Sequence, residues 1–442
     1  MYRKAFLILS LLAFCVDAAA ATKAIKFGKL WDGHKVINNA VVIVDNDKIT
    51  SVTANGKIPA GAEVIDLSRY TGIPGMIDAH THITYYWSGA PGTGPRNQPP
   101  RNPAVTVVLS QENGMKALEA GVTTLRDLNA SNGMDIALRD LINMGKLTGP
   151  RLFVSGVGLH GPRGGVTGNR GTGTAGNRGA AAAPAAAGLG GLADTPENAK
   201  ISTEEAIKAG ADWVKVFGST GGFENVSGDQ TVSYEAMKMI VDTAHALGHK
   251  VAIHSYGPAG ARDAIRAGAD SLEHATDMDD ATIAEMVRKK IFYVPTIDHN
   301  QYYVENADDV YHFAPGSKEN LLDYIQRNYV TATKAYKAGA RMVVGSDAVY
   351  NGFGLNMREL TWFVKMGMTP EEALKTCTLN PAEMLGMEKS LGQVAPGFFA
   401  DIVAVEGDPL ADINVVLKNV RWVMKGGSVV ADKRKQAAGR SN

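Results

Sequence analysis

The chain has 442 residues, a length that suits one large domain with a smaller one attached. Lys and Arg together number 45, as do Asp and Glu, so the formal net charge is zero. This balance gives no support for a nucleic acid partner or for attraction to an anionic membrane surface.

Residues 1–21 are typical of a secretory signal peptide. Two basic residues precede an apolar run over 5–16, and small residues suited to signal peptidase follow. We therefore expect cleavage near Ala20 or Ala21 and export to the periplasm or beyond the cell; a buried N-terminal helix is the alternative. Cleavage would leave Cys377 as the single cysteine, which excludes an intramolecular disulfide. No other segment approaches the roughly 20 continuous apolar residues of a membrane span.

Apolar and polar residues alternate in residues 22–72 and again in 389–434, with Asn, Asp and Gly turns between the segments. This pattern is typical of β-hairpins. Neither end of the chain is large enough to bury a core alone, so we expect the two ends to pair into one small β-sandwich. Residues 435–442 are predicted to be a polar tail.

Residues 73–388 contain a repeated unit: a helical run, a small residue with glycine, and a short apolar strand. The unit occurs as ALEAGVTTLRDL, AIKAGADWVKVF, AHALGHKVAIHS, AIRAGADSLEHA and AYKAGARMVVGS. Its glycines stand where a helix would end in a left-handed cap: Gly121, Gly210, Gly248, Gly268 and Gly339.

Three further strand candidates bring the total to eight. They are expected near residues 75–82, 122–127, 151–158, 213–217, 250–254, 271–274, 291–296 and 341–346. Eight strand–helix steps in one chain predict an α/β fold of the (β/α)8, or TIM-like, barrel type. A doubly wound open sheet is the alternative, but its Gly-rich phosphate turn does not follow the first strand.

A Gly/Ala/Arg-rich loop over residues 161–192 interrupts this pattern after the third strand. It has no periodicity and little that could pack. It should emerge on the face where barrel enzymes carry their functional loops. An ordered lid and a disordered insertion without a role both remain open.

Polar residues follow several of the predicted strands at their carboxyl ends. His80 and His82 are two apart, so they project to the same side of the first strand. The others are one lysine within a strand, two histidines at strand ends and one aspartate after the last strand: Lys215, His254, His274 and Asp347. Each has an ordinary structural explanation, but together four imidazoles and a carboxylate suit Zn²⁺ or a similar divalent ion.

Lys215 lies in the apolar strand DWVKVF and therefore points into an interior where an ammonium group is unfavourable. A buried lysine has a lowered pKa and can react as a neutral amine. It could form a Schiff base or take up CO₂ to give a carbamate. Beside four histidines, we favour the carbamate, whose two oxygens can bridge two metals.

These features resemble the amidohydrolase superfamily. The resemblance rests on HTH after the first strand, the lysine of DWVKVF, the two strand-end histidines, the aspartate of GSDA, the CTLNPAEMLG helix and the GQVAPGFFADIVAV return. It is strongest to the imidazolonepropionase-like and prolidase-like branch, which includes dipeptidases, carboxypeptidases and ochratoxin-type amidases.

The resemblance implies two divalent metal ions, with zinc expected. One would be held by His80, His82 and Asp347, and the other by His254 and His274. Carboxylated Lys215 would bridge them. A homo-oligomer is also implied, with an octamer as one form.

The function implied is hydrolysis, by a metal-activated hydroxide, of the amide bond to a C-terminal amino acid in dipeptides or N-acyl amino acids. Asp347 would take the proton and pass it to the leaving amine. Hydrolysis of cyclic amides or lactones is a second hypothesis, and a catalytically silent barrel used for binding or surface assembly is a third.

Candidate substrate contacts are less well defined. Tyr234, in TVSYEAM, resembles a family tyrosine that bonds the substrate carbonyl, or packs at a helix start. His160 falls where relatives carry a substrate-contacting loop. Both are retained as candidate catalytic residues. Arginines within the 161–192 loop could clasp a substrate carboxylate or merely aid solubility: Arg163, Arg170 and Arg178.

The aromatic residues Tyr85, Tyr86 and Trp87 directly follow the first two histidines. They could wall an apolar substrate pocket or pack beneath a loop. Acidic residues for a basic side-chain pocket are sparse, with only Asp298 beside His299 in PTIDHN. We therefore expect apolar or aromatic leaving residues rather than Lys or Arg.

Overall fold

A computed structural model describes residues 22–95, 98, 101–162, 190–221, 226 and 228–434. The expected signal peptide, the polar tail from 435 and residues 163–189 of the Gly/Ala/Arg-rich loop lie outside these residues. Within the described part of the chain, no helix combines the length and apolar character that crossing a bilayer requires.

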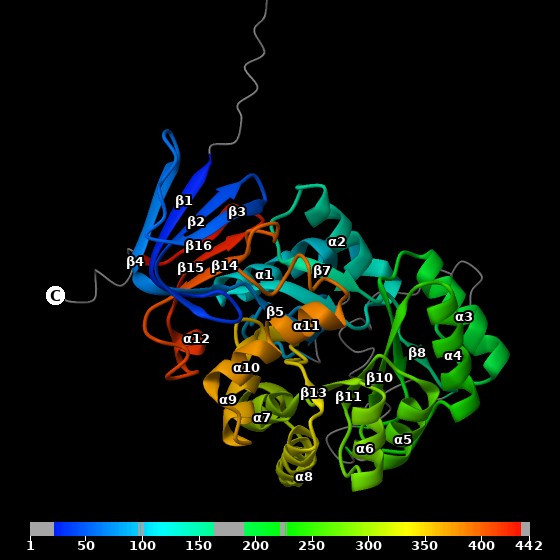
Figure 1. Cartoon of the computed structure of the whole chain (residues 1–442). Helices are drawn as coiled ribbons and strands as arrows, with labels where there is room; N and C mark the ends of the chain where they lie inside the picture. The colour runs from blue at the N-terminus through cyan, green and yellow to red at the C-terminus, as the bar shows by residue number, and fades with distance from the viewer. Residues whose placement is uncertain are drawn as a thin grey trace, which may run out of the picture.

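Parallel strands form the centre of the molecule (Figure 1). They are β5 (Met76–Thr81), β6 (Val122–Asp127), β7 (Arg151–Val154), β8 (Leu159–His160), β9 (Trp213–Phe217), β10 (Lys250–Ser255), β11 (Ser271–His274), β12 (Phe292–Val294) and β13 (Arg341–Met342). Regular pairing places β5, β6 and β7 in one sheet and β8 to β13, in chain order, in another.

The structure has a strand at each predicted position, with two differences in extent. The third predicted strand, 151–158, ends at Val154, and a short additional strand, β8, follows it at Leu159–His160. The last predicted strand, 341–346, is regular only over Arg341–Met342. The five predicted helix-ending glycines all have positive φ, between 80° and 104°. Glycine adopts this conformation without the steric penalty that a Cβ atom brings, so the chain can turn there from helix into strand.

Backbone hydrogen bonds cross both gaps between the two parallel sheets. On one side, Ala79 N donates to Val344 O (2.9 Å) and Asp347 N donates to His80 O (2.7 Å). On the other side, Asp212 N donates to Val154 O (2.7 Å). The first and last parallel strands therefore lie side by side, which brings their carboxyl ends together.

Helices alternate with the parallel strands and cover them. They are α1 (Pro103–Glu119), α2 (Met134–Asn143), α3 (Pro196–Lys208), α4 (Tyr234–Ala246), α5 (Pro258–Ala267), α6 (Asp280–Arg288), α7 (Ile297–Glu305), α8 (Ser317–Lys337), α9 (Glu359–Lys365), α10 (Pro370–Thr376), α11 (Leu379–Met384) and α12 (Val415–Lys418). Side chains cap several of their first turns, as Thr195, Ser233 and Asp279 do for α3, α4 and α6.

Both ends of the described chain contribute to one further sheet, seen in blue and red in Figure 1. Its order is β16-β15-β14-β4-β1-β2-β3. The bounds are β1 (Lys23–Trp31), β2 (Val36–Asp45), β3 (Lys48–Ala54), β4 (Glu63–Pro74), β14 (Ile402–Val405), β15 (Val420–Lys425) and β16 (Ser428–Asp432).

The predicted pairing of the two ends is therefore observed between β4 and β14. Phe27, Leu67 and Trp422 belong to a buried core of this sheet. A partly buried ion pair between Arg151 and Asp401 (2.5 Å) joins β7 to the residue before β14. The hydrogen-bonded pairing of these seven strands gives one sheet, whereas a sandwich requires two layers. The β-sandwich therefore stays a prediction.

Candidate metal centre

His80, His82 and Asp347 lie together where the first and last parallel strands end. One ligand atom from each falls within a group spanning 4.8 Å. His82 Nε2 is 3.0 Å from Asp347 Oδ1, and His80 Nε2 is 3.7 Å from the same oxygen. All three residues are buried, so the cluster combines two imidazoles and a carboxylate away from bulk water.

His254 and His274, at the ends of β10 and β11, adjoin this cluster. Their ring centroids are 4.5 Å apart, and the His274 ring is 5.0 Å from the His80 ring. Lys215, on the neighbouring β9, is only 1% exposed. β9 pairs in parallel with β10, the strand that carries His254. Burial is the main cause of the lowered pKa of His80, His254 and His274, and the charge of Lys215 contributes to it.

Burial favours the neutral form of the basic side chains in the cluster. It lowers the pKa of His80 to about 4 and holds the pKa of His254 and His274 well below the ordinary value. It also lowers the pKa of Lys215 to about 8, although the charges of Glu273 and Asp347 act in the opposite direction. Neutral imidazole is the form that binds metal.

Asp347 is ionised in this setting. Burial raises the pKa of its carboxyl, but the neighbouring imidazoles of His299, His80 and His82 outweigh burial and hold the pKa well below its usual range. The site therefore combines a buried carboxylate with several nitrogen donors, which is the ligand chemistry that Zn²⁺ accepts.

A buried ion pair orients the His80 ring through its Nδ1 atom. Its Nδ1 lies 2.8 Å from Glu273 Oε2, and the other oxygen of Glu273 is 2.8 Å from Arg126 Nη2. Burial raises the pKa of Glu273, but Arg126 and His80 overcome this and lower it to about 2. A carboxylate on Nδ1 leaves the Nε2 of His80 directed toward Asp347, the arrangement by which proteins commonly fix metal-binding histidines.

Asp78 fixes the two backbone segments that carry the cluster. Its carboxylate accepts hydrogen bonds from Ser346 Oγ (2.5 Å), Asn356 Nδ2 (2.8 Å) and His80 N (3.2 Å). The carboxyl is fully buried, and burial raises its pKa to about 6. It therefore holds the end of β5 against the loop that contains Asp347.

Two of the ring nitrogens fit the role of metal ligands for a further reason. His82 Nδ1 and His254 Nε2 are buried and have no hydrogen-bond partner among the described residues. A buried polar atom left without a partner is unfavourable, so such atoms mark places where a ligand, ion or water belongs. The donor set therefore fits divalent metal.

Of the three candidate aromatic substrate residues, Tyr85 contacts a histidine of the cluster, whereas Tyr86 and Trp87 bond to other residues. The Tyr85 ring stacks on His82 with centroids 4.9 Å apart. Tyr86 instead donates to Glu112 (2.8 Å), and Trp87 donates to Thr93 (3.0 Å).

His160 and Tyr234 lie on β8 and at the start of α4. His160 Nδ1 is 2.8 Å from the carbonyl oxygen of Gly161. The Tyr234 ring packs against Arg266, whose guanidinium carbon is 4.1 Å from the ring centroid, in the helical layer. The loop arginines Arg163, Arg170 and Arg178 lie outside the described residues.

Tyr256 and His299 contact the cluster but were not among the sequence candidates for the site. The Tyr256 ring is 4.5 Å from His254 and 5.0 Å from His274. His299 Nε2 is 3.3 Å from Asp347 Oδ2. Tyr256 stands two residues after His254, the same spacing that linked His80 with His82, so the two-residue period could have identified it.

Known proteins resemble this chain in sequence over most of its length. The Amidohydrolase family matches residues 71–430. An ochratoxinase from Aspergillus niger is 31% identical over 425 residues, covering 90% of this chain and 84% of that protein. An imidazolonepropionase from Fusobacterium nucleatum subsp. nucleatum is 24% identical and covers 92% of this chain and 95% of its own length.

Solved structures agree with these relatives. A crystal structure of a Xaa-Pro dipeptidase with methionine bound in its active site superposes with a TM-score of 0.79, at 29% identity, over 92% of this chain and 99% of that one. The structure of A. niger ochratoxinase has a TM-score of 0.77, at 27% identity, over 94% and 96% of the two chains. With a buried His/Asp cluster at the strand ends and a family match over most of its length, the chain belongs to the amidohydrolase family and is a metal-dependent hydrolase of carbon–nitrogen bonds.

Proposed function

We propose that the protein is an exported, binuclear metal-dependent amidohydrolase that releases a C-terminal amino acid from dipeptides or N-acyl amino acids. Zinc is the expected metal, and Lys215 is the expected carbamate bridge. The relatives named above, an ochratoxinase and a Xaa-Pro dipeptidase, support this substrate class.

One observation carries the proposal: His80, His82 and Asp347 form a buried group of possible metal ligands, and His254 and His274 lie beside it. His80, His82 and Asp347 would hold one metal, and His254 with His274 would hold the other. Bound divalent ions would polarise the scissile carbonyl and lower the pKa of bound water toward neutral pH. The two ring nitrogens without partners, on His82 and His254, are available for this purpose.

Lys215 is suited to carboxylation because burial already weakens its ammonium form. With a pKa of about 8, a useful fraction of the side chain is a neutral amine near neutral pH, and the amine is the form that attacks CO₂. The product would carry a negative charge among neutral imidazoles. Carboxylation would thus replace a buried cation with an anion whose two oxygens could face two metals.

Asp347 and Tyr256 have complementary proton chemistry. The ionised carboxylate of Asp347 can take a proton from the attacking water and deliver it to the leaving amine. Burial raises the pKa of Tyr256, so its phenol stays protonated and can donate to the carbonyl oxygen of the substrate. We assign this role to Tyr256 in place of Tyr234, because Tyr256 contacts the histidines.

The architecture and cellular location are inferred in the same way. The hydrogen bonds between β5 and the segment after β13 support a closed (β/α)8 barrel, and the mixed terminal sheet supports a small sandwich. The sequence of residues 1–21 supports export, and the family resemblance supports a homo-oligomer. N-terminal sequencing of the secreted protein tests the export, and light scattering tests the oligomer.

The test of function is amino acid release from a panel of dipeptides and N-acyl amino acids by zinc-loaded enzyme. Turnover with apolar or aromatic C-terminal residues is expected. The imidazolonepropionase relative favours a second candidate, hydrolysis of cyclic amides or lactones. If only ring substrates are turned over, the second candidate replaces the first.

A further inference from the structure

The turn between β12 and α7 contacts a metal-ligand candidate. Thr296, the residue before α7, is fully buried, and its Oγ1 lies 2.6 Å from His274 Nδ1. Its backbone has a φ of 50°, a conformation that β-branched residues rarely adopt. The chain therefore holds Thr296 in a strained conformation while its hydroxyl group contacts His274.

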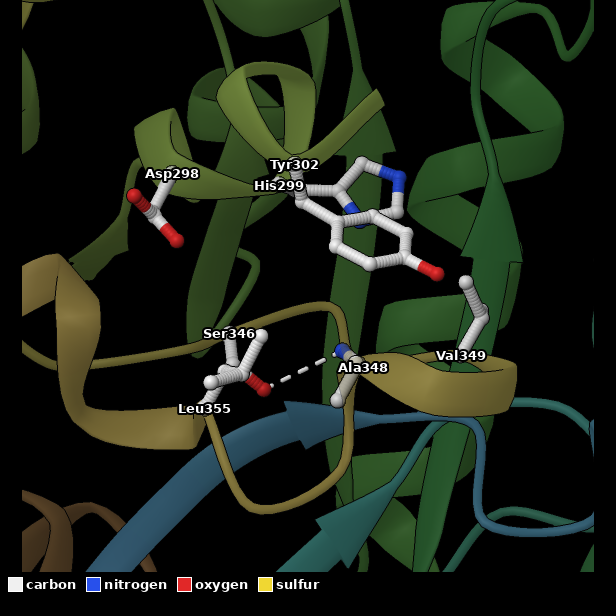
Figure 2. Close-up of a pocket in the computed structure, with 8 residues that line it drawn as sticks. Asp298, His299, Tyr302, Ser346, Ala348, Val349 and Leu355 are labelled. Atoms are coloured by element: carbon white, nitrogen blue, oxygen red, sulfur yellow. Dashed lines mark hydrogen bonds between the residues drawn. The ribbon is translucent and has the colours of Figure 1, made fainter. Parts of the chain in front are cut away.

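Three residues later, the first turn of α7 contacts the candidate catalytic base. His299 Nε2 is 3.3 Å from Asp347 Oδ2. Figure 2 shows α7 supplying Asp298, His299 and Tyr302 to one side of a small pocket, with Ser346, Ala348 and Val349 on the other. Thr296 and His299 thus contact both His274, at the end of β11, and Asp347, in the loop after β13.

A buried carboxyl group from α9, whose pKa burial raises to about 8, is hydrogen-bonded to the start of α7. Both oxygens of Glu359 accept backbone hydrogen bonds, from Ile297 N (2.9 Å) and Asp298 N (2.8 Å). Glu359 is 1% exposed. The first amides of a helix have no partner within the helix, and a carboxyl group placed there satisfies two of them at once.

The neighbouring side chains strengthen the same attachment. Asp298 lies 3.0 Å from Arg358 Nε and accepts a hydrogen bond from Trp362 Nε1 (3.1 Å). Both partners come from the segment that contains Glu359. Three side chains of this segment therefore bind two successive residues of the turn.

We propose that residues 296–299 form a positioning element, anchored by Glu359, that fixes His274 through Thr296 and Asp347 through His299. The inference rests on the metal centre proposed above and adds three positioning residues to it. In the proposed arrangement Nδ1–H of His274 donates to Thr296 Oγ1, and this tautomer leaves Nε2 of His274 free for metal. His299 restricts the rotation of the Asp347 carboxylate.

Thr296→Val and Thr296→Ser form a matched pair that tests the first contact. Valine keeps the branched shape but removes the hydroxyl, whereas serine keeps the hydroxyl. Loss of such an outer contact commonly weakens metal binding or activity by about 10–100-fold. We expect this loss in Thr296→Val, measured by competition with a zinc chelator, and near-normal zinc affinity in Thr296→Ser.

Glu359→Gln tests the anchor, since an amide can accept only one of the two backbone hydrogen bonds. We expect kcat per zinc-loaded enzyme to fall roughly tenfold with a smaller change in KM. The control is Glu372→Gln, because Glu372 also accepts a backbone amide, from Thr369 (2.7 Å), but at the exposed start of α10. This control should leave kcat unchanged.

The outcomes separate the two proposals. Unchanged zinc affinity in Thr296→Val, together with unchanged kcat in folded Glu359→Gln, would overturn the positioning role while the metal centre stands. Should Glu359→Gln fail to fold, zinc affinity in the Thr296 pair decides alone. A wild-type protein that binds no divalent metal would overturn both.

Discussion

The two ends of the parallel strands differ in what they bury. At the amino ends, Trp213 and Phe292 begin β9 and β12 and pack in an apolar cluster with Met384 of α11. At the carboxyl ends, imidazoles, a lysine and carboxylates are buried instead, two of their ring nitrogens without partners in the described chain. We therefore expect substitutions at the apolar end to affect mainly stability and those at the polar end to affect mainly the chemistry.

Left-handed backbone conformations occur within the site itself. His274, Thr296 and Asp347, all at the carboxyl ends, have φ values of 68°, 50° and 50°. Such conformations cost on the order of 1–3 kcal/mol each and persist where the surroundings enforce them. The comparison predicts that substitutions at the two ends will separate activity from stability.

The largest expected effect is that of Lys215→Ala. Loss of the bridging group should reduce the bound zinc and lower kcat/KM on the order of 10⁴-fold or more. Metal analysis and kinetics on the same preparation check this, with circular dichroism as the control for folding. A folded variant with normal zinc and activity would remove Lys215 from the mechanism.

Asp347→Asn should follow, with kcat reduced roughly 10³-fold because the amide cannot accept a proton. The substitution preserves size, so the secondary structure should be unchanged. Since Asp347 is also a candidate ligand, kcat is to be expressed per bound metal. A kcat within tenfold of the wild type at full metal content would exclude it as the general base.

Phe292→Ala examines the opposite end of the strands. Removing this buried ring should destabilise the fold by about 3–5 kcal/mol through lost burial and a cavity. Urea denaturation of the metal-free protein measures the change. The folded fraction should keep wild-type kcat, and a large loss of kcat would show that the two ends are not separable.

Tyr256→Phe and Tyr234→Phe give the smallest but most specific contrast. Loss of the Tyr256 hydroxyl should lower kcat on the order of a hundredfold, as for other donors to a developing oxyanion. Tyr234 packs against Arg266, so its substitution should have little effect on kcat. The reverse order would restore the role that the family resemblance gave to Tyr234.

Much of the fold could be predicted because its signals are local. Helix-ending glycines and apolar runs located the strands, and strand ends located the histidines, the lysine and Asp347. The break between β7 and β8 contains Gly156, with a φ of 61°, and Gly158, and the prediction wrongly continued the strand through both glycines.

The outer contacts of the site could not be predicted in this way. Glu359 and Ile297 are 62 residues apart in the chain, and Glu273 and His80 are 193 apart. Nothing in one sequence pairs such residues. Tyr256 could have been identified from its spacing to His254. His299 was considered only as a neighbour of the acidic Asp298.

The central claim is that Lys215 bridges two metals as a carbamate. The most direct measurement combines zinc analysis with ¹³C NMR on enzyme prepared with zinc and ¹³C-labelled bicarbonate. The account predicts two zinc ions per chain and a carbamate signal that is missing from Lys215→Ala. A fully active enzyme with a single zinc ion and no carbamate signal would contradict it.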